Sequence, residues 1–179
     1  MEVIDSSAVV EDNVKNGGNK MSVVICGFSG IGKSSVAEAL ANSSKLIVDM
    51  ESSVYSHNAN GSFNDSFPQN YIDALEACIE TDLGDYYLLS CHQSVRDELK
   101  KRGIKYILIR PERSCRNEYV KRWLNRGSTA EFITNMYSKW DEMIDSCIED
   151  EVPTVVLSEN EYLSDAIFSD SKPKKRLNG

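Results

Sequence analysis

A glycine-rich segment near the start of the chain constrains its fold more than any other feature. Residues 27–34 read Gly-Phe-Ser-Gly-Ile-Gly-Lys-Ser and fit the phosphate-loop pattern G-x-x-x-x-G-K-S/T at every fixed position. In such a loop, glycines let backbone N–H groups surround a phosphate, the lysine reaches the outer phosphates, and the final hydroxyl can bind Mg²⁺. The pattern therefore predicts a site for a nucleoside triphosphate.

The residues on either side of the loop support this interpretation. The apolar run 21–26 predicts a buried strand, and the apolar spacing in 34–41 predicts a helix. Strand, loop and helix thus follow in the order that a phosphate loop requires, while a plain glycine-rich turn is the alternative. The residues expected to contact the nucleotide are Gly27, Ser29, Gly30, Ile31, Gly32, Lys33, Ser34 and Ser35.

Further apolar runs alternate with amphipathic segments along the rest of the chain. Strands are expected at 45–49, 86–90, 104–109 and 153–157, and helices at 68–79, 94–102, 111–126 and 161–168. A capping box at Ser128 and Glu131 predicts one more helix, which runs to Cys147, and the polar segment 52–66 is expected to be a loop. The alternation predicts an α/β fold with right-handed crossovers and a five-stranded parallel sheet covered by helices on both faces.

Composition narrows the class of protein. The chain has 179 residues, which suits one domain, and a net charge of -8, which argues against a general nucleic-acid binder. Its five cysteines include no C-x-x-C pair and no stretch reaches membrane-spanning length, so a cytoplasmic protein with reduced thiols is expected. We expect a loose extension over 1–20, one folded domain over 21–169 and a basic tail over 170–179. The tail is expected to be solvated, and a nucleic-acid or nuclear-import signal is the alternative.

Two acidic residues follow the second predicted strand. Ligands of parallel sheets bind beyond the carboxyl ends of the strands, which is where Asp49 and Glu51 are expected to lie. Asp49 can hold Mg²⁺ through water or orient an acceptor hydroxyl, and Glu51 is a second candidate for binding the acceptor. The alternative is that Asp49 caps the turn that follows it.

Arginines are concentrated in one segment of this acidic chain. Arg113, Arg116, Arg122 and Arg126 all lie in this segment, and Arg122 and Arg126 are four residues apart, on one helix face. Guanidinium groups stabilise the charge of a transferring phosphoryl group, although a solvated face that pairs with Glu112 and Glu118 is the alternative.

A further arginine follows the third predicted strand. Arg96 can clamp a phosphate or carboxylate of an acceptor, or it can pair with Asp97 or Glu98 at the surface.

These motifs together resemble the small P-loop kinases. The segments are GFSGIGKSS at the loop, VDMESS after the second strand, SCHQSVRDEL after the third, and VKRWLNRG in the lid position, within residues 21–158. The group includes the nucleoside monophosphate kinases and the gluconate and shikimate kinases, and compact nucleotide kinases of phages look similar. The resemblance implies a three-layer α/β fold of the P-loop NTPase type, with the strand order 2-3-1-4-5 and a kinase domain over 21–169. It also implies ATP and Mg²⁺ as cosubstrates and a mobile acceptor-binding region after the second strand. It also implies roles for Lys33 and Ser34 in the loop, Asp49 after the second strand, Arg96 at the acceptor, and Arg122 and Arg126 as the lid pair.

The leading hypothesis is an enzyme that moves the γ-phosphoryl group of ATP to a nucleoside monophosphate, with no membrane partner. The expected catalytic residues are Lys33, Asp49, Arg122 and Arg126; the expected acceptor contacts are Asp49, Glu51 and Arg96; the expected metal ligands are Ser34 and Asp49. One alternative changes only the acceptor, to a gluconate- or shikimate-like metabolite. The other is a nucleotide-binding switch or NTPase subunit, in which hydrolysis drives a partner.

Overall fold

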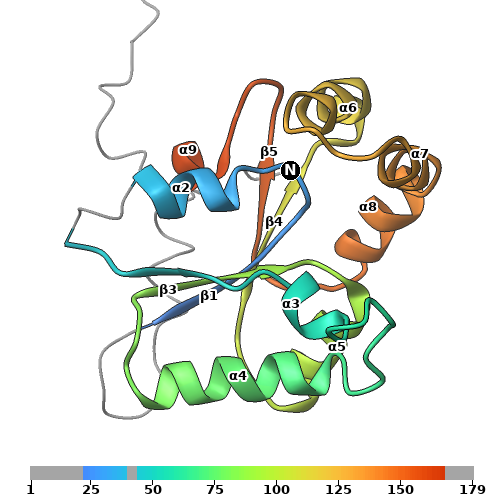
Figure 1. Cartoon of the computed structure of the whole chain (residues 1–179). Coiled ribbons are helices and arrows are strands. Elements are labelled where there is room, and N and C mark those ends of the chain that lie inside the picture. Colours follow the sequence, from blue (N-terminus) through green and yellow to red (C-terminus); the bar gives the residue numbers. More distant parts are fainter. Residues whose placement is uncertain (1–21, 40–43, 168–179) are drawn as a thin grey trace, which may run out of the picture.

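A five-stranded parallel sheet forms the centre of the molecule (Figure 1). The computed structural model describes residues 22–39 and 44–167. The strands lie in the order β2-β3-β1-β4-β5, which confirms the predicted topology. Their bounds are β1 Val23–Gly27, β2 Ile47–Asp49, β3 Tyr86–Ser90, β4 Ile107–Pro111 and β5 Thr154–Leu157. Every residue of β1 is buried, as expected for the central strand of a parallel sheet covered on both faces.

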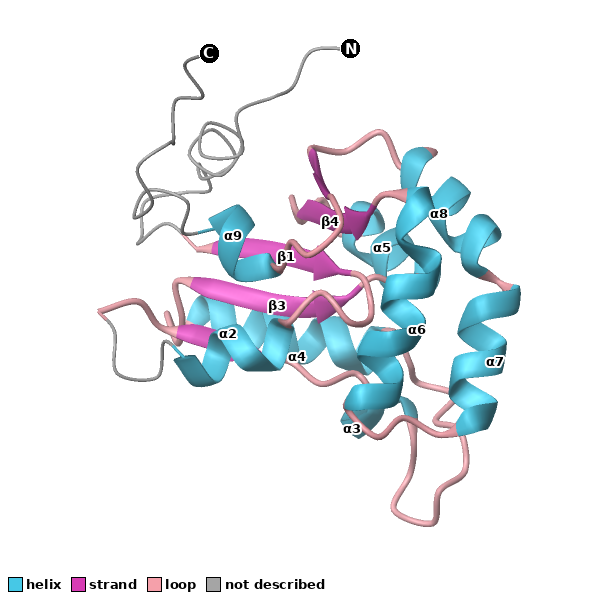
Figure 2. Cartoon of the chain, turned by 90° about the horizontal axis from the view of Figure 1, so that it is seen from above, coloured by secondary structure: helices cyan, strands magenta, loops and turns pink. Residues whose placement is uncertain are grey.

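Helices cover both faces of the sheet. One face carries α2 (Lys33–Ala39) and α9 (Leu163–Ile167), and the other carries α4 (Gln69–Glu80) and α5 (Gln93–Lys101), as the two views together show (Figures 1 and 2). At the end of the sheet stand α6 (Arg116–Asn125), α7 (Ala130–Ser138) and α8 (Trp140–Ile148). Two short elements remain. The single turn α3 (Ser53–Ser56) lies within the segment expected to be a loop, and a 3₁₀ turn at Arg113–Cys115 precedes α6.

The single helix predicted up to Cys147 is wrong, because the chain breaks into α7 and α8 at Lys139. The two parts pack against different neighbours, α7 against α6 and α8 against β4. Trp140, the first residue of α8, is fully buried, and its indole N–H donates to the carbonyl of Arg113 at 2.9 Å. A straight helix cannot satisfy both contacts, so apolar periodicity alone missed the break.

The predicted capping box is also displaced by one residue. Thr129 is the N-cap of α7, and its side chain accepts the N–H of Phe132 at 3.2 Å. The hydroxyl of Ser128 instead accepts a hydrogen bond from Nε of Arg126 at 2.8 Å. The proposed extension over 1–20 and tail over 170–179 lie outside the described residues. In the part of the chain that is described, no helix has both the length and the apolar character needed to cross a bilayer.

Candidate active site

The glycine-rich segment forms a tight loop between β1 and α2. Gly30 and Gly32 have φ angles of +93° and +96°, in the left-handed region that favours glycine. A Cβ at Gly30 would lie 3.0 Å from the indole nitrogen of Trp123, and one at Gly32 would lie 3.3 Å from the ring of Tyr162. Backbone conformation and close packing therefore both require glycine at these two positions.

Contacts from three elements hold the loop in place. The N–H of Phe28 donates to Ile109 of β4 at 2.9 Å, and the buried ring of Phe28 packs edge-on against Trp140. From α6, the indole N–H of Trp123 donates to the carbonyl of Ser29 at 3.2 Å. At the start of α9, the N–H of Leu163 donates to the carbonyl of Ile31 at 2.8 Å.

Ile31, which was predicted to contact the nucleotide, could do so only through its backbone, because its side chain is buried in the core.

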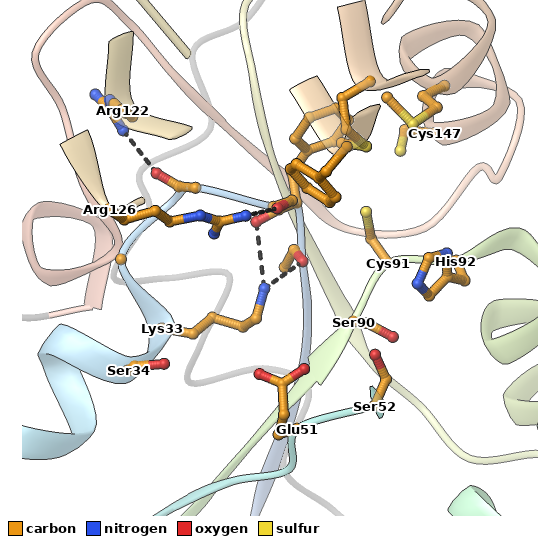
Figure 3. Close-up of a pocket in the computed structure, with 18 of the residues that line it drawn as sticks. Lys33, Ser34, Glu51, Ser52, Ser90, Cys91, His92, Arg122, Arg126 and Cys147 are labelled. Carbon is orange, nitrogen blue, oxygen red and sulfur yellow. Dashed lines mark hydrogen bonds between the residues drawn. The ribbon is translucent and has the colours of Figure 1, made fainter. Parts of the chain in front are cut away.

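Lys33 folds back over its own loop. Its Nζ donates to the carbonyls of Gly27 at 2.8 Å and Phe28 at 3.3 Å (Figure 3). Burial lowers the pKa of Lys33 from its ordinary value, because the charged form loses water. The side chain is thus a partly desolvated cation at the centre of the loop, held by weak neutral acceptors that an anion can replace.

Ser34 and Asp49 meet at the edge of the sheet. The hydroxyl of Ser34 donates to Oδ2 of Asp49 at 2.8 Å. The alternative that Asp49 caps the following turn is wrong, since the N–H of Ser53 contacts the carboxylate of Glu51 instead. Hydroxyl and carboxylate oxygens are ligands that Mg²⁺ accepts directly or through water, so this pair fits the expected metal. Within the described residues no group of three or more His, Cys, Asp or Glu side chains could hold a metal, and Mg²⁺ normally needs only one or two from the protein.

The two predicted lid arginines lie in different surroundings. The guanidinium of Arg126 reaches the loop and donates to the hydroxyl of Ser29 at 3.1 Å (Figure 3). Arg122 points away from Lys33, with only 8% of its side chain exposed. It donates to the carbonyl of Gly30 at 3.2 Å, pairs with Glu118, and lies 3.9 Å from the ring centre of Tyr162. Arg126 is therefore placed to meet a ligand, and Arg122 braces the loop.

The other two arginines of that segment lie outside the cavity. Arg113 pairs with Asp141 and Asp145 of α8, and Arg116 pairs with Asp141. These contacts join α6 and the preceding turn to α8 through charges that are largely exposed. The alternative interpretation, in which these arginines pair with Glu112 and Glu118, holds only for Arg122 and Glu118. Arg113 and Arg116 pair with acids of α8 instead.

Arg96 is held by the protein itself, which argues against the predicted role at the acceptor. Its guanidinium lies 2.9 Å from Asp150, and the two side chains are only 2% and 5% exposed. It also donates to both the carbonyl and the hydroxyl of Ser146 and to the carbonyl of Cys91. The surface partners Asp97 and Glu98 are wrong as well, because Glu98 pairs with Lys101 and Arg102. Arg96 therefore ties the end of β3 to α8.

A cavity of about 880 Å³ opens in front of the loop and extends beyond it. Lys33, Ser34 and Arg126 line it on the loop side, and Glu51 lines it after β2, whereas Asp49 lies outside the lining. Figure 3 shows Cys91, His92 and Cys147 on the far side. The volume is near the upper end of the range of small-molecule sites, about 300–1,000 Å³.

The thiols at the far side of the cavity are free and close to one another. A hydrogen bond with Cys147 lowers the pKa of Cys91, and the cations of Lys33 and Arg96 lower it further against the effect of burial. The same contact raises the pKa of Cys147. Nothing in the sequence indicated that these two thiols meet.

Comparisons with known proteins do not identify the chain. No family model and no curated protein matches the sequence. The solved structure of TT1252 from Thermus thermophilus aligns with it at a TM-score of 0.41 and 15% identity, over 81% of this chain and 92% of that one. A similarity of that size supports no inference about function, so the interpretation rests on the geometry of the site.

Sequence reasoning missed two aromatic residues that shape the loop, Trp123 and Tyr162. Trp123 was visible as part of the apolar stripe of its helix, but its partner Ser29 lies 94 residues away in the chain. Tyr162 belongs to no sequence motif. In the structure it is 42% exposed, and its ring contacts both Gly32 and Arg122.

Proposed function

We propose that this protein is an ATP-dependent phosphotransferase that moves the γ-phosphoryl group to a small acceptor. The observation that carries the proposal is the continuation of one cavity from the phosphate loop to the far wall at Cys91 and Cys147. A protein that only binds or hydrolyses a nucleotide needs the loop but not the space beyond it. The acidic side chain of Glu51 lines the cavity between these two parts.

The loop side would bind the triphosphate. Backbone N–H groups between Gly27 and Lys33 would surround the phosphates, and Nζ of Lys33 would exchange its carbonyl acceptors for the more strongly charged phosphate oxygens. Ser34 would hold Mg²⁺ directly and Asp49 through water. When bound, the metal supplies positive charge that neutralises the phosphate oxygens.

Arg126 is the best candidate for stabilising the transferring group. Its guanidinium already reaches the loop at Ser29, and arginine remains protonated at any physiological pH even where burial lowers the pKa, as it does here. Such a cation acts on charge that develops during transfer and is worth about 2.7–4 kcal/mol where one donor of this kind has been removed. Arg122 also lines the cavity, but its guanidinium is held by the loop carbonyl at Gly30 and by Glu118, so we assign it a positioning role.

Glu51 is placed to act on the acceptor. Its carboxylate faces Lys33 across the cavity (Figure 3). From there one of its oxygens would accept a hydrogen bond from an acceptor hydroxyl and take up its proton. The new O–P bond would form as the bond between the γ-phosphorus and its bridging oxygen breaks, with ADP as the leaving group. The loop itself does not choose between acceptors, so the choice depends on the far part of the cavity.

A transfer experiment tests the proposal. The purified chain is given Mg²⁺ and ATP labelled in the γ-phosphoryl group, together with a fractionated pool of small metabolites, and labelled products are separated from inorganic phosphate. We expect a labelled acceptor with wild-type protein and none with Lys33→Ala, while Lys105→Ala, an exposed lysine outside the cavity, behaves as wild type. Label that appears only in inorganic phosphate would favour the switch or NTPase alternative. Failure to bind a non-hydrolysable ATP analogue would overturn nucleotide binding itself.

A further inference from the structure

Five sulfur-containing side chains and one aromatic ring line the cavity beyond the loop. They come from the residue after β2, the residue after β3, and from α7 and α8: Met50, Cys91, Phe132, Met136, Met143 and Cys147. Thioether sulfur is polarisable and makes favourable contacts with aromatic rings, and methionine adapts its shape to what it packs against. This wall suits the apolar or aromatic body of a ligand.

The cations that line the cavity, as far as the structure describes it, are Lys33, Arg96, Arg122 and Arg126. Lys33 and Arg126 belong to the phosphate loop, where the triphosphate would use them. Arg122 is bound to Glu118 and to the loop carbonyl at Gly30. Arg96 already has the buried carboxylate of Asp150 and three further acceptors. Arg126 also lies 5.2 Å from the ring centre of Phe132, but the triphosphate would use its charge. Among the lining residues, no cation is then left for a second anionic ligand.

Other charged groups there would repel an anion. The carboxylates of Glu51 and Glu142 line the same cavity. Desolvation of its ring lowers the pKa of His92, and the cations of Lys33 and Arg96 lower it further, so this imidazole is neutral at pH 7. Arg110 on β4 lies outside the lining. A second phosphate or carboxylate in this cavity would lose water and meet the carboxylates of Glu51 and Glu142, while the cations of the lining already have partners.

From these contacts we infer that the acceptor is an uncharged hydroxyl compound with an apolar or aromatic body, of the chemical class of a nucleoside. This inference rests on the proposed phosphotransferase function and changes the acceptor expected from the sequence. A nucleoside monophosphate or a sugar acid brings an anion, and both need a cation that Arg96 was expected to provide. In the structure that arginine neutralises Asp150 instead.

Matched acceptor pairs test the inference. Each nucleoside is compared with its own 5′-monophosphate, and sorbitol with gluconate, by measuring kcat/KM for phosphoryl transfer from saturating Mg·ATP. We expect at least one nucleoside to exceed its monophosphate at least tenfold. If a monophosphate or gluconate has a kcat/KM ten times that of its neutral partner, the inference is overturned while the phosphotransferase proposal stands. The inference is also overturned if only anionic compounds of the panel are phosphorylated. Binding of a non-hydrolysable ATP analogue, measured separately, shows whether the phosphotransferase proposal itself has failed.

A charge reversal in the far wall sharpens the test. Glu142→Lys places a cation where the structure has a carboxylate, and it should raise the use of monophosphates relative to nucleosides about tenfold. Glu142→Gln should shift this ratio less, and Glu149→Lys, the same change at an exposed residue outside the lining, should leave it unchanged. An unchanged ratio in Glu142→Lys would contradict the charge argument.

Discussion

Replacing Arg96 by methionine should destabilise the fold severely. Methionine keeps the apolar stem but removes the cation that lies 2.9 Å from Asp150, where the two side chains are 2% and 5% exposed. Removing one partner of a buried ion pair costs about 3–5 kcal/mol, because the other charge stays buried. Lys100 and Tyr106 still contact Asp150, so we expect about 3 kcal/mol. For a chain of this size that corresponds to a loss of about 6–12 °C in Tm.

Urea unfolding at several pH values measures this effect. Burial raises the pKa of Asp150, but hydrogen bonds from Lys100, Tyr106 and Arg96 outweigh it and leave the pKa below its ordinary value. A carboxylate whose pKa is depressed by folding contributes stability above its unfolded pKa, about 3.9, and this contribution is lost as the pH falls through the folded pKa. The difference between wild type and Arg96→Met should therefore be full at pH 7 and shrink below about pH 4.

Lys100→Met provides the matched control. Lys100 contacts the same carboxylate but is 41% exposed, so its removal should cost less than about 1 kcal/mol. A free energy of unfolding for Arg96→Met within 1 kcal/mol of wild type would refute the structural role. If Arg96→Met were stable and also failed to bind the acceptor, this result would support the acceptor-binding role predicted for Arg96 from the sequence.

Three further predictions concern the cavity. Arg126→Ala should raise the activation free energy of transfer by about 2–4 kcal/mol, seen as a lower kcat, with little change in stability. Arg122→Ala should instead lower the free energy of unfolding by about 2 kcal/mol. Equal effects of the two variants on kcat and on unfolding would contradict the different roles given to these arginines. Asp49→Asn should abolish turnover but keep nucleotide affinity, as measured by calorimetry, and near-normal turnover would remove the carboxylate from the metal site. Cys91, whose pKa is lowered by its contact with Cys147, should react with iodoacetamide at lower pH than the other thiols, and mass spectrometry that finds another thiol modified first would contradict this.

Local sequence pattern was enough to predict the sheet and the tight glycine-rich loop between β1 and α2. A phosphate loop is one continuous stretch of backbone, so the spacing of Gly27, Gly32, Lys33 and Ser34 carries its whole geometry. The alternation of buried strands with helices, joined by right-handed crossovers, leaves few sheet orders, and the predicted order is the observed one. Asp49 was found in the same way, because the end of a parallel strand lies at the ligand edge.

What each arginine does was decided only by tertiary structure. Arg122 and Arg126 have the spacing of a matched pair, but the packing of α6 turns the first toward Glu118 and Tyr162 and the second toward Ser29. Arg96 finds one of its acceptors 50 residues away, at Ser146. Periodicity reports which face of an element is apolar, whereas the partner of a charge depends on which elements meet in space. The same long-range packing brings the cavity wall together from separate segments, and with it the chemistry of the acceptor that we propose.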